Sequence, residues 1–218
     1  MNTLALRFPR QLALATLALL ALATPVRAIT YLDNLSGTFF SSIGLTHSLS
    51  FALPFTTDNS ATVFYLNDIT VTVGGSSQTQ SFSVGLYSNN GGVPSLAITD
   101  GAGSTSPTTT GNYTYSFLPT PLQPDTEYWV VLANSSFSVG DEYFWKEAAT
   151  APDLGTWTSN TTALQASFNG GTSWSPYSNG AYPMLSVVAT PVDVPEPSSY
   201  AALLALPALA LACFRRRK

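Results

Sequence analysis

Apolar and polar residues alternate with a period of two along much of the chain between residues 29 and 194. Successive side chains of a strand point to opposite faces, so this alternation predicts β-strands with one buried face. Sustained apolar spacing of the helical kind does not occur in this region. The segments that predict strands are 48–55, 69–73, 82–87, 113–117, 128–133, 164–168 and 184–189.

The segment 128–133 is apolar on both faces, which predicts a central strand covered on both sides. Gly, Asn and Pro residues separate the short strands, as in β-sandwiches and jelly rolls. We therefore expect an all-β, sandwich-like or jelly-roll-like domain over residues 29–189. The small polar segment 101–112 predicts a mobile loop, and the Pro-rich segment 190–197 predicts an extended linker.

The N-terminus has the features of a secretory signal peptide. Two arginines precede an apolar run over residues 12–23, and small or branched residues, Val26 and Ala28, occupy the −3 and −1 positions of a cleavage site. The run is shorter than the roughly 20 residues of a membrane span. We expect a signal helix over residues 1–28, removed after Ala28; an uncleaved N-terminal anchor is the alternative.

Three features follow one another at the C-terminus: a Pro-Glu-Pro motif, an apolar stretch over residues 200–214, and a terminal basic cluster. The apolar stretch predicts a helix of about 22 Å, thin for a permanent anchor. Its basic end is expected on the cytoplasmic side of the membrane. We therefore expect a transmembrane sorting helix with a basic tail over residues 198–218. The residues of the motif and the cluster are Pro195, Glu196, Pro197, Arg215, Arg216, Arg217 and Lys218.

This C-terminal arrangement resembles the PEP-CTERM protein-sorting signal of exported proteins in Gram-negative bacteria. The resemblance implies processing of the tail by an exosortase-type enzyme and transient anchoring in the inner membrane. It further implies delivery to the cell surface or extracellular matrix and association with exopolysaccharide and biofilm. An ordinary single-pass C-terminal anchor is the alternative.

Two internal segments carry a second resemblance. Residues 84–95 read as a strand, a Gly-rich turn and a Pro exit, and residues 122–132 read as a turn that leads into a central strand. Together with a later Trp-containing stretch, they resemble the choice-of-anchor R domain over about residues 32–188. That family is an exported β-rich module, and the resemblance implies no catalytic residues.

The net charge of −4 is an average over unlike parts of the chain. Residues 29–194 contain eleven acidic residues and one basic residue, Lys146, which gives −10, and the other basic residues lie in the two ends. Such an acidic body is repelled by phosphates, so we expect no nucleic-acid partner. The single cysteine, Cys213, excludes an intramolecular disulfide framework.

Catalytic motifs are scarce in this sequence. His47 is the only histidine, and no Gly-x-Ser-x-Gly motif accompanies it, which argues against a Ser-His-Asp triad. Glu127 and Glu142 are candidate acids for polysaccharide hydrolysis, but the sequence does not mark either as the group with a raised pKa. Solvated acids in turns are the simpler interpretation, and we predict that the protein is not an enzyme.

Three tryptophans in loop-rich sequence, Trp145, Trp157 and Trp174, are candidates for stacking on sugar rings. The alternative is that their rings fill the ends of the sandwich core. We expect no metal site and no cofactor. Calcium is the one ion to consider, because carboxylate and amide oxygens in loops are its usual ligands. Its candidate ligands lack EF-hand spacing: Asp58, Asn59, Asn67, Asp68, Asp141 and Glu142.

These observations predict an exported, non-enzymatic protein of the cell surface or extracellular matrix. Its expected partners are the secretion machinery, an exosortase-type enzyme, the inner membrane and exopolysaccharide. A carbohydrate-binding module that uses loop aromatics is the alternative function. A polysaccharide hydrolase that uses acids such as Glu127 or Glu142 is the third.

Overall fold

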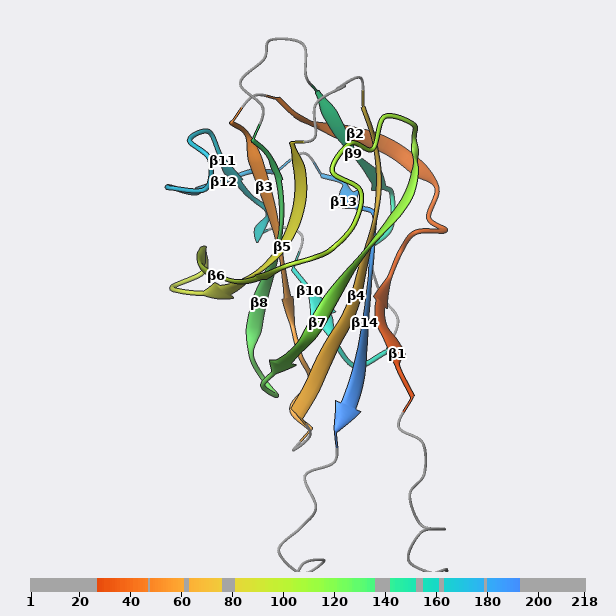
Figure 1. Ribbon diagram of the computed structural model, residues 1–218, viewed down its shortest axis with the longest axis vertical. Helices are drawn as coiled ribbons and strands as arrows, with labels where there is room; N and C mark the ends of the chain where they lie inside the picture. The colour runs from red at the N-terminus through yellow and green to blue at the C-terminus, as the bar shows by residue number, and fades with distance from the viewer. Residues whose placement is uncertain are drawn as a thin grey trace, which may run out of the picture.

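Two antiparallel β-sheets, packed against each other, form the body of the protein in a computed structural model (Figure 1). The structure describes residues 27–192 except 47, 61–62, 76–80, 136–141, 152–154, 161–162 and 179. The predicted signal helix lies outside these ranges except for Arg27 and Ala28, and the predicted C-terminal helix lies wholly outside them. Within the described ranges, no helix has the length and apolar character to cross a membrane. The all-β prediction is confirmed, and the arrangement is consistent with a β-sandwich.

The first sheet is built around its longest strand, β4, and is named the β4 sheet. On one edge β4 pairs with β7, and on the other it pairs with β14 and, at its end, with β9. The outermost strands are β1 beside β14 and β2 beside β9. The strands of this sheet are β1 (Ile29–Asp33), β2 (Phe39–Leu45), β4 (Val63–Gly75), β7 (Gly111–Leu122), β9 (Tyr143–Ala148), β13 (Tyr182–Pro183) and β14 (Leu185–Val192).

The second sheet is built around β8 and is named the β8 sheet. Its order is β12-β11-β3-β8-β5-β6, and β10 also pairs with β3. Residues 128–132 of β8 are all buried between neighbours on both edges, which confirms the predicted central strand covered on both faces. The strands are β3 (Ser50–Thr56), β5 (Phe82–Asn89), β6 (Pro94–Asp100), β8 (Glu127–Asn134), β10 (Thr158–Ser159), β11 (Gln165–Ser167) and β12 (Ser175–Pro176).

The main core lies between the two sheets and follows the alternation seen in the sequence. On β3, Phe51, Leu53 and Phe55 all point into this core, while Ala52 lies on the outer face. A buried side chain of this size contributes about 1.5–3 kcal/mol relative to an exposed one, so the alternation fixes which face of each strand turns inward. The inward residues of β4 include Ile69, Val71 and Val73, all fully buried.

The segment predicted as the mobile loop 101–112 closes one side of the sandwich. Ala102 forms a bridge to Ser116 of β7, with N–O distances of 2.8 and 3.0 Å, and the Gly101 amide donates to Val84 O of β5 at 2.9 Å. A Cβ atom on Gly103 would lie 2.4 Å from the Tyr115 ring. Its small residues therefore permit close packing between the sheets. Apart from the bridge at Ala102, residues 101–110 are loop as predicted, and β7 begins at Gly111, so only the last two residues of the predicted loop are strand. The mobility of this loop stays a prediction.

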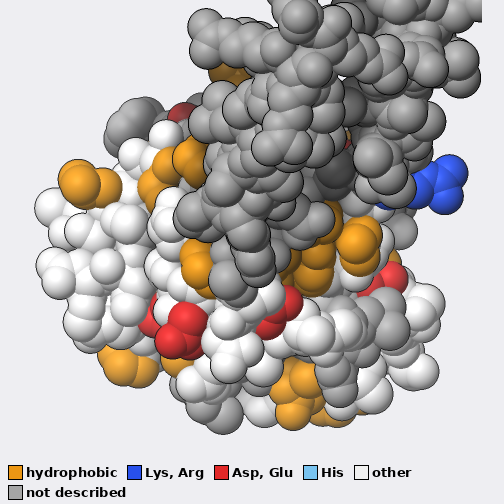
Figure 2. Space-filling model, turned by 90° about the horizontal axis from the view of Figure 1, so that it is seen from below, with side chains coloured by type: hydrophobic (Ala, Val, Ile, Leu, Met, Phe, Trp, Pro, Cys, Tyr) orange, Lys and Arg blue, Asp and Glu red, His pale blue; other side chains and the backbone are white. Residues whose placement is uncertain are grey.

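Both described ends of the chain lie at one end of the sandwich (Figure 1). β1 and β14 are antiparallel neighbours, with Ile29 opposite Ala189. β14 continues to Val192, so the first three residues of the predicted linker 190–197 are strand, because they pair with β4 as far as Val63. Figure 2 views the molecule from this end and shows acidic side chains on it.

The turn at residues 122–128 is held by its own side chains. The Tyr128 hydroxyl accepts a hydrogen bond from the Gln123 amide at 2.8 Å, an arrangement related to the tyrosine corner of β-sandwiches. Thr57 crosses to this turn: its hydroxyl donates to Gln123 O at 2.7 Å and accepts from the Thr126 amide at 3.0 Å. Residues 122–128, part of the segment that carries the second resemblance, therefore form a turn that side-chain hydrogen bonds hold in place.

Candidate functional site

The outer face of the β4 sheet carries paired hydroxyl and amide side chains. The hydroxyl oxygens of Thr70 and Thr114 lie 2.9 Å apart, and the Thr72 hydroxyl donates to Asn112 Oδ1 at 2.7 Å. These contacts form because β4 and β7 place the same residues directly opposite each other. This face therefore presents hydrogen-bonding groups at fixed positions.

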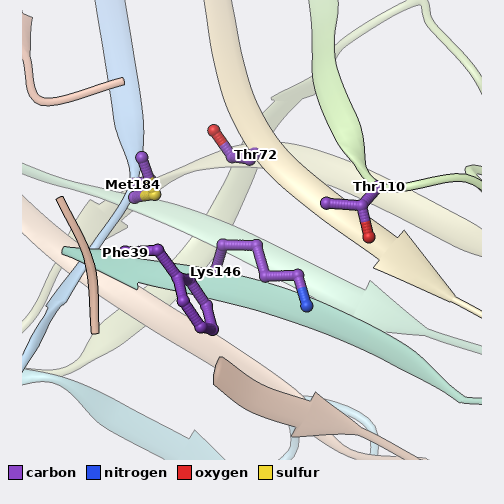
Figure 3. Close-up of a pocket in the computed structure, with 5 residues that line it drawn as sticks. All are labelled: Phe39, Thr72, Thr110, Lys146 and Met184. Carbon is purple, nitrogen blue, oxygen red and sulfur yellow. The ribbon is translucent and has the colours of Figure 1, made fainter. Parts of the chain in front are cut away.

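A pocket of about 300 Å³ lies on this face beside Thr72 (Figure 3). Its walls come from segments far apart in the sequence. Phe39 belongs to β2, Thr72 to β4 and Lys146 to β9. Thr110 precedes β7, and Met184 lies between β13 and β14. The fold, and not any local motif, assembles this site.

Two backbone features shape the pocket. A Cβ atom on Gly74 would lie 2.5 Å from Thr110 Oγ1 and 2.8 Å from Thr110 Cα, so glycine is required for Thr110 to lie against β4. The pairing of β2 with β9 shifts register between Phe39 and Ser41. Such irregularities re-aim side chains at strand ends. The Phe39 ring remains 59% exposed at the rim.

Lys146 places the positive charge of the body at this pocket. Its Nζ lies 5.5 Å from the centre of the Phe39 ring and 5.8 Å from that of Phe144, within the range of cation–π attraction. The next residue, Glu147, is fully buried and accepts a hydrogen bond from the Ser41 hydroxyl. Glu147 therefore faces the opposite side of β9 from Lys146. Figure 3 shows the lysine side chain extended across the pocket.

Two of the three tryptophans proposed for sugar stacking are core residues. Trp145 is 0% exposed and donates from Nε1 to Met184 O at 3.0 Å. Trp157 is 1% exposed, and its ring centre lies 4.4 Å from that of Tyr31. Neither ring presents a face to a ligand, because both side chains fill the space between the sheets. The stacking hypothesis is therefore corrected for these two residues.

Trp174 lies on the outer face of the β8 sheet and is half-buried. It packs with Tyr87 against a small second cluster that contains Trp129 and Val131. Trp129 is fully buried there and donates from Nε1 to Asn89 Oδ1 at 3.2 Å. Trp174 thus covers a second, smaller core, and of the three tryptophans it is the one that keeps an exposed part.

The acids proposed for hydrolysis are not brought together. Glu127 begins β8, and Glu142 precedes β9 next to the Gly75 end of β4. Glu127 pairs with Thr56, the last residue of β3, and the chain runs from there into the start of β4 at Val63. Glu127 therefore lies near the Val63 end of β4. The two carboxyl groups therefore lie at opposite ends of the sandwich, whereas glycosidase pairs lie within about 10 Å.

Three of the five described calcium candidates are engaged in hydrogen bonds within the protein. Asp68 accepts from the Ser116 hydroxyl at 2.7 Å, and Asn67 Oδ1 accepts from the Thr190 hydroxyl at 2.7 Å. Asp58 accepts from the Ser60 amide at 3.0 Å and from the Thr156 hydroxyl. Across the described part of the chain, no three His, Cys, Asp or Glu side chains group together as a metal site. Asp141 lies outside that part.

We expect the carboxyl group of Asp58 to stabilise the folded protein to an extent that depends on pH. Burial alone raises the pKa of its carboxyl, but the hydrogen bonds from Ser60 and Thr156 outweigh burial and hold the pKa below its ordinary value. A lowered folded-state pKa stabilises the fold above the unfolded-state pKa, and this stabilisation is lost as pH falls through the folded-state value.

We therefore expect Thr156→Val to be less stable than the unmodified protein at neutral pH, with the difference shrinking towards about pH 2. Urea unfolding at both pH values measures this change. A difference of the same size at both values would contradict the assignment.

Several predicted site residues fall outside the described ranges. They are Val26 of the cleavage site and all residues of the sorting motif and basic cluster: Pro195, Glu196, Pro197, Arg215, Arg216, Arg217 and Lys218. Ala28 is described and exposed, directly before β1. A cut after Ala28 therefore leaves every strand intact.

Sequence reasoning did not identify the pocket. Phe39, Thr72, Thr110 and Met184 carry no local motif, and β2 and β9 were not among the predicted strands. The one signal in the sequence was Lys146, the sole cation of the body, two residues from Phe144. That spacing places both side chains on one face of a strand.

Comparison with known proteins identifies one part of the chain. Residues 193–218 match the PEP-CTERM protein-sorting motif, and this match confirms the predicted sorting signal. The comparison with curated proteins finds no match for the chain. The motif is that of exported proteins that an exosortase-type enzyme processes in Gram-negative bacteria. The chain therefore carries, directly after its last strand, the sorting signal of a secreted, cell-surface-targeted protein.

Proposed function

We propose that this protein is a non-enzymatic component of the cell surface or extracellular matrix, associated with exopolysaccharide and biofilm. The observation that supports this role is the sorting motif at residues 193–218, which begins one residue after β14 ends. The β-sandwich is then the delivered part, and the two chain ends serve export and sorting. This role needs neither a cofactor nor a catalytic residue.

The position of the ends fits this route. β1 and β14 pair with each other, so the signal peptide and the tail both continue from one end of the sandwich. Removal of the first 28 residues and of residues 193–218 leaves all the described strands in place. In this proposal the inner membrane holds the chain transiently by the tail, and processing by the exosortase-type enzyme releases a folded domain. We assign that domain to the choice-of-anchor R-like modules.

Expression in a Gram-negative host with and without an exosortase tests the sorting step. We expect the protein from the host with the enzyme to lack the C-terminal basic cluster, and the protein from the other host to keep it. Mass spectrometry of secreted and membrane fractions measures both ends.

Replacement of Pro195, Glu196 and Pro197 by Ala is the matched control, and it should leave the tail intact in both hosts. An intact tail on the unmodified protein in both hosts would contradict the sorting proposal.

Carbohydrate binding is a second candidate function. The pocket on the outer face of the β4 sheet favours it, because an exposed ring and a cation lie together there. Hydrolysis has no comparable support, since Glu127 and Glu142 lie at opposite ends of the sandwich and Glu147 is buried.

A further inference from the structure

We propose that the pocket between Phe39 and Lys146 binds a uronate, a sugar unit that carries a carboxylate, within an acidic polysaccharide. The inference rests on the proposed association with exopolysaccharide and assigns it a site and a ligand class. Neither the tryptophans nor the acids singled out from the sequence take part in it.

Charge is the first reason for an anionic ligand. Lys146 is the one Lys or Arg between positions 28 and 214, and the fold places it at the pocket. Its ammonium group lies over two phenyl rings, those of Phe39 and Phe144, which attract a cation without neutralising its charge. A carboxylate that enters the pocket gains a charge-assisted hydrogen bond from the ammonium group.

The walls of the pocket supply the second reason, because apart from Lys146 they present apolar surface. The exposed Phe39 ring and Met184 offer apolar surface against which the C–H face of a sugar ring packs. The hydroxyl groups of Thr72 and Thr110 are turned aside, since Thr72 is buried and donates to Asn112 and Thr110 Oγ1 lies against Gly74. Both threonines therefore extend the apolar surface, and Lys146 is the charged group that lines the pocket.

Size and position favour a single sugar unit at the end of a longer contact. A volume of about 300 Å³ is at the lower limit of pockets for small molecules. The paired side chains of β4 and β7 continue away from the pocket along the same face, with Thr70 and Thr114 next in line. Neighbouring sugar units would therefore lie over hydrogen-bonding groups and not over apolar surface.

The acidic body limits what the pocket selects. A charge of −10 over residues 29–194 repels a polyanion at long range, and salt screens this repulsion beyond about 10 Å at 0.1 M ionic strength. Attraction therefore has to come from contacts at the pocket itself. This predicts recognition of one carboxylate at short range and not general binding of negatively charged polymers.

A comparison of an acidic sugar with its neutral ester tests the site. Trigalacturonate and its methyl ester share the sugar rings and differ in the charge and in one methyl group at each carboxyl, and calorimetry with the exported protein measures the affinity for each. We expect the acid to bind at least about tenfold more tightly, the effect of one hydrogen bond to a charged group. In Lys146→Met this preference should disappear, whereas Lys146→Arg should keep it.

Phe39→Ala gives an independent readout. The ring contacts the sugar and not the carboxylate, and Phe144 still lies against Lys146 in this variant, so acid and ester should both bind more weakly while the preference for the acid is kept. Thermal melting of each variant checks that the fold is retained. Equal affinity of the unmodified protein for acid and ester, or a preference that persists in Lys146→Met, would overturn the proposal.

Failure of this proposal is distinguishable from failure of the proposed function. Binding is measured on the protein that the host releases, or on the full chain in detergent where the tail is retained. Tail processing is scored by mass in a separate experiment. A processed protein without acid preference overturns the pocket alone, and an unprocessed protein that prefers the acid overturns the sorting route alone.

Discussion

Trp157→Ala is expected to lower the free energy of unfolding by about 3–5 kcal/mol, the usual cost of removing a buried aromatic side chain from a core. For a domain of this size, the loss corresponds to a fall in melting temperature of about 6–20 °C. Calorimetric or circular-dichroism melting measures it. This is the largest effect that we expect from a single substitution in the described part of the chain.

The packing around Trp157 explains the magnitude. Its ring stacks between Tyr31 and Phe55, with centres 4.4 and 5.5 Å away, and meets the edge of Phe64 at 5.1 Å. These partners come from β1, β3 and β4 and therefore from both sheets. Loss of the ring opens a cavity that neither sheet can fill, because each partner is itself held in its strand.

Two control substitutions separate packing from other effects. Trp157→Phe keeps a stacked ring, and Nε1 of Trp157 has no hydrogen-bond partner among the described residues, so its cost should be well below that of Ala. Phe168 is 73% exposed, and Phe168→Ala should change stability by less than about 0.5 kcal/mol. If Phe168→Ala cost as much as Trp157→Ala, the assignment of Trp157 to the core would be wrong.

Asn34→Ala is expected to destabilise the protein by about 2–4 kcal/mol, because it leaves buried backbone groups without partners. The Asn34 side chain accepts from the Leu185 amide at 2.8 Å and donates to Pro183 O at 3.2 Å and Thr150 O at 3.3 Å. It therefore joins the residue after β1 to the last residue of β13 and the first residue of β14. Urea unfolding of the two proteins gives the difference.

Asn112→Ala is the matched control for this prediction. Asn112 is exposed and accepts one hydrogen bond, from the Thr72 hydroxyl, so its loss should cost less than about 1 kcal/mol. The comparison holds the type of residue constant and changes only its burial and number of partners. Equal losses for the two variants would contradict the role assigned to Asn34.

Much of the fold followed from local pattern. The strands β3, β4, β5, β7, β8, β11 and β14 each overlap a segment predicted from alternation. Alternation succeeds there because these strands turn one face to the core, and β8 was recognised because it is apolar on both faces. The longer strands β1, β2, β6 and β9 were missed, as were the two-residue strands β10, β12 and β13. On β6 four consecutive residues, 95–98, are exposed, so its sequence lacks the contrast that alternation needs.

The candidate site was less accessible to sequence reasoning. Trp145 and Trp157 were considered for sugar stacking because they lie in loop-rich sequence, yet both are core residues. Local composition does not report which of several aromatic side chains the two sheets enclose. Phe39, by contrast, is an exposed ring beside the only cation of the body, and nothing near it in sequence marks it as such.

The sequence alone determined the delivery of this protein, because sorting signals are read as linear segments. The Pro-Glu-Pro motif, the apolar stretch and the terminal arginines lie within residues 193–218 and need no partner from the body. The all-β class was determined locally too, since a period of two is a property of each strand. Only the tertiary structure decided which side chains meet: the pairing of β2 with β9 and of β4 with β7 brings Phe39, Thr72, Thr110 and Lys146 to one pocket. Contacts between residues more than 70 positions apart depend on strand order and register, and these are set by the packing of the whole core.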